Sequence, residues 1–207
     1  MTGIGLPRPP VSILDQPWLI LFEPDKSLWQ WVVDNLLSDQ SPLYNPDHEH
    51  LTDASIGFLW TNTENSSKGR QVIGQCEELT FRCGKWQKAR QQLQMAEWFG
   101  DIPDYVITLD ANYCAECSDT ELLALIEHEI YHIGQATDDA GMPKFNRDTG
   151  APSLCIRGHD VEEFIGVVRR YGVGQPDSSL AQLVLAASRK PEISSIDISK
   201  SCGTCIA

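Results

Sequence analysis

Two histidines and a glutamate stand at a spacing suited to metal chemistry. Residues 128–132 read His-Glu-Ile-Tyr-His, which is the pattern H-E-x-x-H. On a helix, residues four apart lie one above the other, so His128 and His132 can bind one zinc ion. Zinc lowers the pKa of a bound water towards ~7, and the adjacent Glu129 can take its proton as the water attacks a carbonyl. The motif therefore predicts zinc-dependent hydrolysis of peptide or amide bonds.

A catalytic zinc site needs a third protein ligand and an open fourth position. The histidines outside the motif are His48, His50 and His159. His159 follows a long glycine-containing segment that lets the chain fold back onto the motif helix, so we expect His159 to be the third ligand. Glu163 is the alternative ligand. Asp160 and Glu163 are otherwise expected to hold a ligand in place by hydrogen bonding, or simply to cap a helix.

The motif lies in the most strongly patterned helix of the sequence. We predict a helix over residues 118–133, where Ser118 and Glu121 form a capping box and apolar residues recur at helical spacing. A strand is predicted before it, at residues 105–109, where β-branched and aromatic residues alternate. This context favours a metal site over the alternative, which is a pair of solvent-facing histidines beside an ordinary surface glutamate.

The rest of the chain is predicted to alternate short elements with loops. Residues 134–158, rich in glycine and aspartate, should form a long loop, a kind of segment that is often functional. His48 and His50 lie in a polar segment, residues 38–53, and we interpret them as solvated loop histidines. The strand at residues 71–81 should pair back on the strand at residues 56–60. Helices are predicted at residues 27–37, 85–99, 160–172 and 178–187.

Three of these features together resemble a known family. The predicted strand, the capped helix with H-E-x-x-H and the downstream sequence His-Asp-Val-Glu-Glu-Phe resemble the putative phage metallopeptidases, small zincin-like proteins encoded by phages and prophages. The resemblance covers roughly residues 56–172, and the two motifs together are more specific than either alone. It implies a zincin core with His128, His132 and His159 on zinc and Glu129 as the general base.

The expected fold class is α+β, with a zincin-like metallopeptidase core in which the H-E-x-x-H helix packs on a small, mostly antiparallel sheet. A chain of 207 residues is long enough to bury one sizeable core without disulfides. We expect an irregular N-terminal arm at residues 1–20, where prolines and glycines precede any periodic pattern. The metallopeptidase domain should span residues 21–188, and a C-terminal tail should span residues 189–207.

Four of the seven cysteines form two C-x-x-C pairs. Four thiolates could hold a second, structural zinc ion, and one pair alone could be a redox motif, although no thioredoxin-like pattern surrounds either pair. The separation of the pairs is far outside zinc-ribbon spacing, and ordering a tail with few apolar anchors is costly. We therefore expect one zinc per chain and reduced thiols. The candidates for the second site are Cys114, Cys117, Cys202 and Cys205.

Charge and hydropathy exclude several classes of partner. Sixteen Lys and Arg residues against 29 Asp and Glu residues leave a net charge of −13. This balance argues against binding to the phosphate backbone of nucleic acids and to anionic membranes. No stretch reaches the ~18 to 20 apolar residues of a membrane span, and no secretory signal is recognisable. We therefore expect a cytoplasmic protein, in the host cell if it is phage-encoded. The predicted chemistry adds the expectation of a protein or peptide substrate.

The predicted function is that of a zinc metallopeptidase that hydrolyses peptide bonds through a metal-activated water. Two alternatives remain open: the same chemistry on cell-wall peptide or amide bonds, and a non-catalytic, zinc-bearing interaction protein of phage origin. The residue that would stabilise the developing oxyanion also remains open. Tyr131 should point elsewhere on the helix, which leaves as candidates Tyr113, Arg157 and Tyr171.

Overall fold

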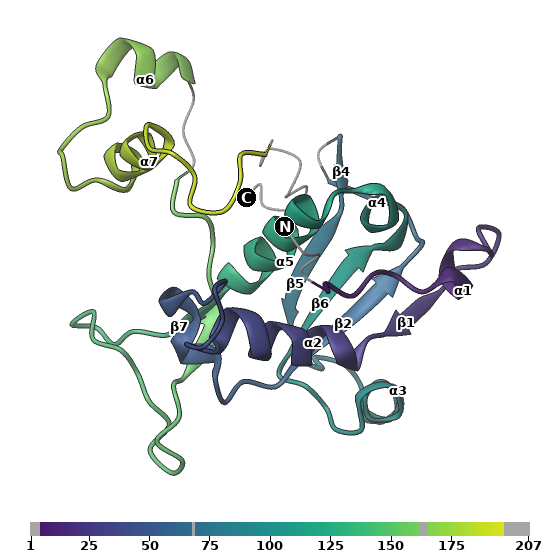
Figure 1. The fold of residues 1–207 in the computed structure, drawn as a ribbon. Coiled ribbons are helices and arrows are strands. Elements are labelled where there is room, and N and C mark those ends of the chain that lie inside the picture. The colour runs from purple at the N-terminus through teal and green to yellow at the C-terminus, as the bar shows by residue number, and fades with distance from the viewer. Residues whose placement is uncertain (1–4, 68, 162–164, 197–207) are drawn as a thin grey trace. The chain divides into compact units, whose positions relative to one another are not determined.

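The computed structural model describes residues 5–67, 69–161 and 165–196. Its contacts divide the chain into two compact units, of which the first runs to Arg157 and the second comprises Gly158–Ile196. The first unit contains a sheet with helices on both faces, and the second contains two helices (Figure 1). None of the helices in the described ranges is both long and apolar enough to span a bilayer.

A four-stranded sheet forms the centre of the first unit. Its strands lie in the order β1 (Phe22–Pro24), β2 (Ile56–Thr61), β6 (Tyr105–Asp110) and β5 (Gly74–Glu78). β2 and β6 are parallel, whereas β1 and β5 pair antiparallel with them at the two edges. The unit is therefore an α+β structure with a small, mostly antiparallel sheet, which confirms this part of the predicted fold class.

The predicted pairing of residues 71–81 with residues 56–60 is wrong. β5 pairs with β6, which separates it from β2. The residue types explain this order. β2 is buried along its whole length and β6 nearly so, and strands with both faces buried belong at the centre of a sheet. β5 carries one glutamine and two glutamates that reach water at an edge.

One face of the sheet is covered by the helices that build the main core. α2 (Lys26–Val32) begins at Asp25, whose carboxylate accepts hydrogen bonds from two backbone N–H groups of the first turn. It continues as the π-helix η1 (Val33–Leu37). These helices and α5 (Asp119–Tyr131) bury apolar side chains in one cluster with alternate residues of β2 and β6.

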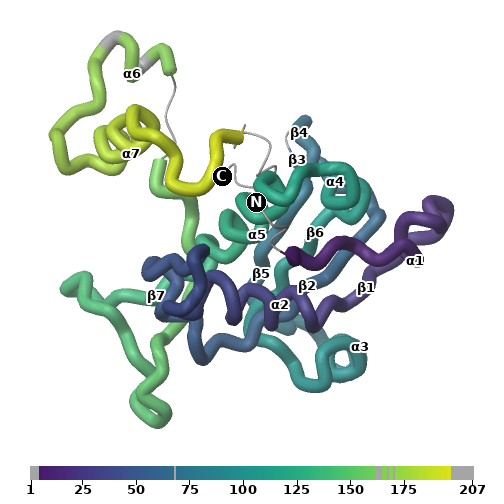
Figure 2. The backbone as a smooth tube through the Cα atoms, viewed as in Figure 1, coloured from purple at the N-terminus to yellow at the C-terminus, as the bar shows by residue number. Residues whose placement is uncertain are grey.

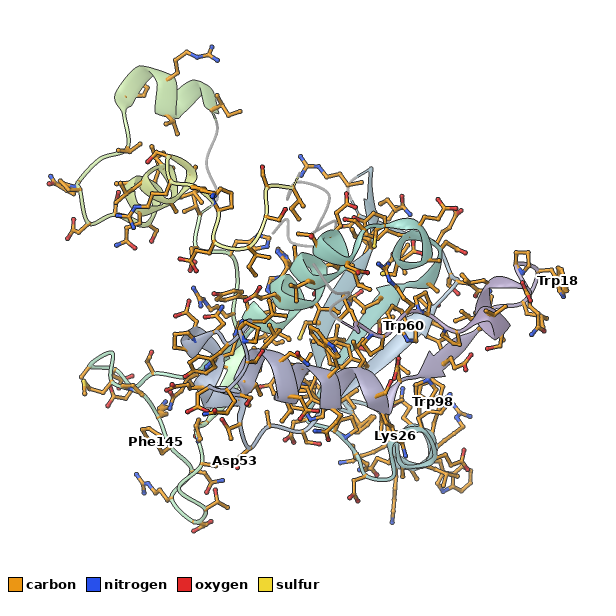
Figure 3. All side chains as sticks on the ribbon, in the orientation of Figure 1. Trp18, Lys26, Asp53, Trp60, Trp98 and Phe145 are labelled. Carbon is orange, nitrogen blue, oxygen red and sulfur yellow. The ribbon has the colours of Figure 1, made fainter. Side chains whose placement is uncertain are left out.

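The opposite face carries α3 (Lys85–Phe99), which the sequence predicts with these same bounds. The helix approaches the sheet closely because Gly57 has no side chain: a Cβ atom there would lie 2.7 Å from the Phe99 ring. Figure 3 shows the buried Trp60 in the interior of the unit, and Trp18, which is exposed, at its periphery.

Short elements complete the first unit. Ahead of β1, the N-terminal segment contributes Leu6 and Ile13 to the core, and the backbone trace runs from α1 into β1 at the edge of the sheet (Figure 2).

The segment 134–158, predicted as a loop, instead contains an antiparallel pair, β7–β8. Cross-strand pairing between distant short segments leaves no periodic signal in a glycine-rich sequence. The short elements are α1 (Val11–Leu14), η2 (Pro46–Leu51), β3 (Asn65–Ser67), β4 (Arg70–Val72), α4 (Ala111–Glu116), β7 (Ile133–Gln135) and β8 (Leu154–Ile156).

The second unit contains α6 (Ile165–Tyr171) and α7 (Ser179–Ala187). Ser178 caps α7 by accepting a hydrogen bond from the backbone N–H of Ala181. The prediction of a helix at residues 178–187 is therefore confirmed.

Candidate metal centre

The H-E-x-x-H residues lie at the end of α5, a helix whose position is set at its start and along one face. Ser118 and Glu121 form the predicted capping box, with the Ser118 N–H donating to the Glu121 carboxylate at 2.9 Å. Such a box satisfies two backbone donors that the first turn would otherwise leave unpaired. The buried face of the helix carries Leu122, Leu123, Leu125, Ile126, Glu129 and Ile130.

His128 and His132 stand together at the other end of this helix. Their ring centroids are 5.1 Å apart with an interplanar angle of 75°. Each ring offers one nitrogen, and these two atoms lie within 4.8 Å of each other. Both side chains are half-buried, so an ion between them would be reachable from solvent. The predicted pairing of the two imidazoles is thus present in the fold.

The ring of His132 is oriented by the β7–β8 hairpin. Its Nδ1 atom lies 2.7 Å from the backbone carbonyl oxygen of Arg157, and the Arg157 N–H donates to the His132 carbonyl at 2.8 Å. When Nδ1 carries the proton, it donates to the Arg157 carbonyl and the lone pair is on Nε2. This is the neutral form in which histidine ligates metals, and a backbone carbonyl is one of its usual partners.

Glu129 is fully buried between α5 and the edge strand β5. A Cβ atom at Gly74 would lie 2.6 Å from the Glu129 Oε1 atom, so only glycine at this position leaves room for the carboxylate. The sequence contains a signal for this contact, because glycine inside a strand often marks a close approach. Burying a carboxylate is costly unless nearby donors or positive charge stabilise it.

Two further predicted site residues lie in the second unit. His159 and Asp160, both exposed, are the second and third residues of the second unit. Chain length alone keeps the Cα atom of His159 within about 7 Å of that of Arg157, which is bonded to His132. Glu163 lies outside the described residues, as do Cys202 and Cys205.

The interpretation of His48 and His50 as solvated histidines is wrong. His48 is fully buried, its ring packs edge-on against Tyr131 with centroids 4.5 Å apart, and its Nε2 atom is 3.4 Å from the Glu127 Oε1 atom. The Nε2 atom of His50 lies 2.7 Å from the carbonyl oxygen of Ile133. Both histidines belong to the 3-10 helix η2, which packs against the end of α5 and was not predicted within the polar segment.

Polar contacts tie η2 to α5 next to the two metal-ligand candidates. Asn45, which caps η2, donates to Glu127 at 2.7 Å and to the Tyr131 hydroxyl at 3.0 Å, and that hydroxyl donates to Asp47 at 2.9 Å. Burial and the Asp47 carboxylate raise the pKa of Tyr131 to about 12. Tyr131 thus bonds to η2, in line with the expectation that it points away from the metal ligands.

A comparison with protein families assigns the chain. The model of a family described as "Putative phage metallopeptidase" matches residues 29–188. The chain belongs to this phage metallopeptidase family. Neither the curated proteins nor the solved structures contain a match to it. The family match confirms the resemblance to this family. It covers residues 29–188, whereas the resemblance was expected over roughly residues 56–172.

Membership of the phage metallopeptidase family has consequences for the site. A metallopeptidase requires a metal ion and acts on a protein or peptide. The donor atoms of the first unit fit a metal such as zinc, because two imidazoles approach each other and one has its tautomer set by a backbone carbonyl. A fully buried carboxylate lies next to them in the sequence.

Proposed function

We propose that this protein is a zinc-dependent metallopeptidase, with His128, His132 and His159 as metal ligands and Glu129 as the general base. The observation that carries the proposal is the bond between the His132 ring and the Arg157 carbonyl. It supports Nε2 as the metal-ligating atom of His132. It also holds Arg157, two residues before His159, next to the His132 ring.

His159 as the third ligand is supported by its tether to Arg157 and by its chemistry. It follows Arg157 by two residues, and the Arg157 carbonyl oxygen lies 2.7 Å from the His132 ring. An imidazole is also a usual third ligand in catalytic zinc sites that already contain two histidines. Glu163 is the alternative, and Asp160 is the candidate to hold the His159 ring by a hydrogen bond.

The chemistry follows from the roles of the side chains. Zinc would act as a Lewis acid and lower the pKa of an attacking water to ~7. Glu129 would accept the proton of that water and deliver it to the leaving amine, a role that typically contributes 10²–10⁴-fold to the rate. The carboxylate lies against Gly74, in space that a side chain at that position would fill. A dication next to the buried carboxylate would also offset the free-energy cost of burying its negative charge.

A peptide substrate is supported by the position of Glu129 beside the sheet edge. β5 is an edge strand of the four-stranded sheet, and Gly74 lies at its start. Extended peptides commonly add to such edges through main-chain hydrogen bonds, with side chains in alternate pockets. We propose that the substrate lies along β5, which would bring a peptide carbonyl near Glu129.

The decisive experiment compares Glu129→Gln with the wild-type protein on a broad peptide library, with zinc content measured in both. We expect the variant to retain its zinc and its fold and to lose hydrolysis, because the ligands remain while the base is gone. Glu116→Gln, which changes an exposed glutamate of α4, is the matched control and should cleave like the wild type. Equal cleavage by Glu129→Gln and wild type would refute the base, and zinc binding without any cleavage would favour a non-catalytic zinc protein.

A further inference from the structure

The C-x-x-C pair at the end of α4 has the geometry of a dithiol that can close into a disulfide. Cys114 is fully buried within the helix, and Cys117, which ends it, is half-buried. The two intervening residues are helical, which places the Cα atoms about 5 Å apart. Disulfides form across Cα separations of about 4.4 to 6.8 Å, so this pair needs little backbone movement to close.

A hydrogen bond within the pair links Cys117 to the backbone of Cys114. The Cys117 thiol donates to the Cys114 carbonyl oxygen at 3.7 Å. The pair is asymmetric in its exposure, because Cys114 is fully buried and Cys117 is half-buried.

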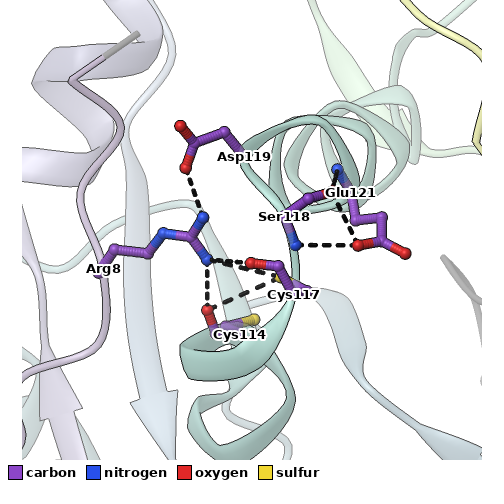
Figure 4. Close-up of polar contacts among 6 residues, drawn as sticks. All are labelled: Arg8, Cys114, Cys117, Ser118, Asp119 and Glu121. Atoms are coloured by element: carbon purple, nitrogen blue, oxygen red, sulfur yellow. Dashed lines mark hydrogen bonds and ion pairs between the residues drawn. The ribbon is translucent and has the colours of Figure 1, made fainter. Parts of the chain in front are cut away.

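Arg8 holds this pair from a distant part of the chain (Figure 4). One guanidinium nitrogen donates to the carbonyl oxygens of Cys114 at 2.7 Å and Cys117 at 2.8 Å, and it lies 3.7 Å from the Cys117 sulfur. The other nitrogen pairs with Asp119. The guanidinium thus has a fixed orientation and presents positive charge to the Cys117 sulfur.

The surrounding charges favour a thiolate on Cys117 and a thiol on Cys114. Hydrogen bonding from Cys114 and the charge of Arg8 lower the pKa of Cys117 to about 7, against burial and the Glu121 carboxylate, which raise it. Cys117 lies between the C-terminal end of α4 and the start of α5, so the two helix dipoles act on its sulfur with opposite sign. The pKa of Cys114 is raised by its hydrogen bond to Cys117, by burial and by Asp110.

We propose that Cys114 and Cys117 form a redox-active dithiol that reduces low-molecular-weight disulfides, with Cys117 as the attacking thiolate and Cys114 as the resolving thiol. The Cys117 sulfur attacks one sulfur of the small disulfide, forms a mixed disulfide and releases one thiolate. Cys114 then attacks the Cys117 sulfur and passes its proton to the thiolate that leaves, which closes the protein disulfide and releases the second product as a thiol. The dithiol is oxidised by two electrons, and the small disulfide is reduced to two thiols. This activity is independent of the proposed peptidase site.

The test uses the full, reduced chain with glutathione disulfide as the probe, followed by alkylation of the remaining thiols and peptide mapping. In the wild type we expect a disulfide between Cys114 and Cys117. Cys114→Ser and Cys114→Ala should stop at a mixed disulfide with glutathione on Cys117. Cys117→Ser should leave Cys114 unmodified because it is buried. Cys83→Ser, which removes a half-buried cysteine elsewhere, should behave like the wild type.

Substitution of Arg8 gives a second readout, which would not change if Arg8 had only a structural role. Arg8→Gln should shift the pH midpoint of Cys117 alkylation upwards and slow disulfide closure by about fivefold at pH 7, since the loss of thiolate is partly offset by higher nucleophilicity. Arg8→Lys keeps the charge and should recover part of the rate. The proposal is overturned if glutathione modifies Cys83 before Cys117, or if Arg8→Gln leaves the pH midpoint unchanged. It is also overturned if removing either cysteine lowers the zinc content by one ion, which would indicate a metal site.

Discussion

The Nδ1 atom of His132 lies 2.7 Å from the carbonyl oxygen of Arg157, 25 residues further along the chain. A second bond, from the Arg157 N–H to the His132 carbonyl, makes the contact part of the pairing that continues into β7 and β8. The end of the H-E-x-x-H helix is therefore aligned with the residues that lead into His159. Both contacts use backbone atoms of Arg157, so they depend on the register of the hairpin rather than on the arginine side chain.

Removal of a histidine ligand should abolish stabilisation by zinc. At a zinc concentration 100 times the dissociation constant, binding to the folded state alone adds about 2.7 kcal/mol to the free energy of unfolding. We expect this gain in the wild type and its loss in His128→Ala and His132→Ala, measured by urea denaturation with zinc or chelator. His50→Gln, which keeps a donor towards the Ile133 carbonyl, should retain the gain. A full zinc effect in His132→Ala would exclude this residue as a ligand.

Gly74→Ala should impair catalysis without removing the metal. The added methyl group would lie 2.6 Å from the Glu129 Oε1 atom, so the carboxylate must move. A displacement of about 1 Å at a reacting group can cost on the order of 10²-fold in rate. We expect a fall in kcat of this size with unchanged zinc content. Gly84→Ala, where the methyl group meets no neighbour, is the control and should keep full activity.

Ser118→Ala should destabilise the first unit through the start of α5. The Ser118 hydroxyl oxygen accepts a hydrogen bond from the Glu121 N–H at 3.3 Å, and the loss of such a cap typically costs about 1 kcal/mol. Urea denaturation should show this decrease in the free energy of unfolding. Ser66→Ala changes an exposed serine of β3 and should stay within about 0.5 kcal/mol of the wild type. Equal stability of the two variants would mean that the capping box contributes nothing.

Glu127 should make stability depend on pH in the acidic range. Burial raises the pKa of this carboxyl group, but the His48 ring, whose Nε2 atom is 3.4 Å away, and the hydrogen bond from Asn45 outweigh that effect and leave the pKa below its usual value. The folded state thus favours the ionised form of Glu127, which adds to the free energy of unfolding. This added stability is complete above the unfolded pKa of about 4.3 and is lost as the pH falls through the lower folded pKa. The difference in unfolding free energy between wild type and Glu127→Gln should therefore shrink as the pH is lowered from 7 to 3.

The pH effect of Glu127 can be traced to its partner by a double-mutant cycle. Asn45→Ala removes the donor that lies 2.7 Å from the carboxylate, so part of the pH-dependent difference should disappear in that background. A difference that is the same with and without Asn45 would show that this hydrogen bond does not lower the pKa.

The local features of this protein could be predicted from the sequence because neighbouring residues determine them. The bounds of α3, the capping box at Ser118 and the spacing of His128 and His132 all depend on residues within one or two helical turns. Helical periodicity and capping are properties of short segments, and the fold keeps them. The two sequence motifs also sufficed to indicate the family that the comparison then identified.

Contacts between distant segments were decided only by the tertiary structure. The place of β5 beside β6, the burial of His48, the bond from His132 to Arg157 and the contact of Gly74 with Glu129 each join residues at least 25 positions apart. Such contacts depend on which apolar faces are buried together and on which strand edges remain to be paired, so no local pattern specifies them. The sequence thus determined which groups could do the chemistry, and packing determined how the His132 ring is turned and where the Glu129 carboxylate is held.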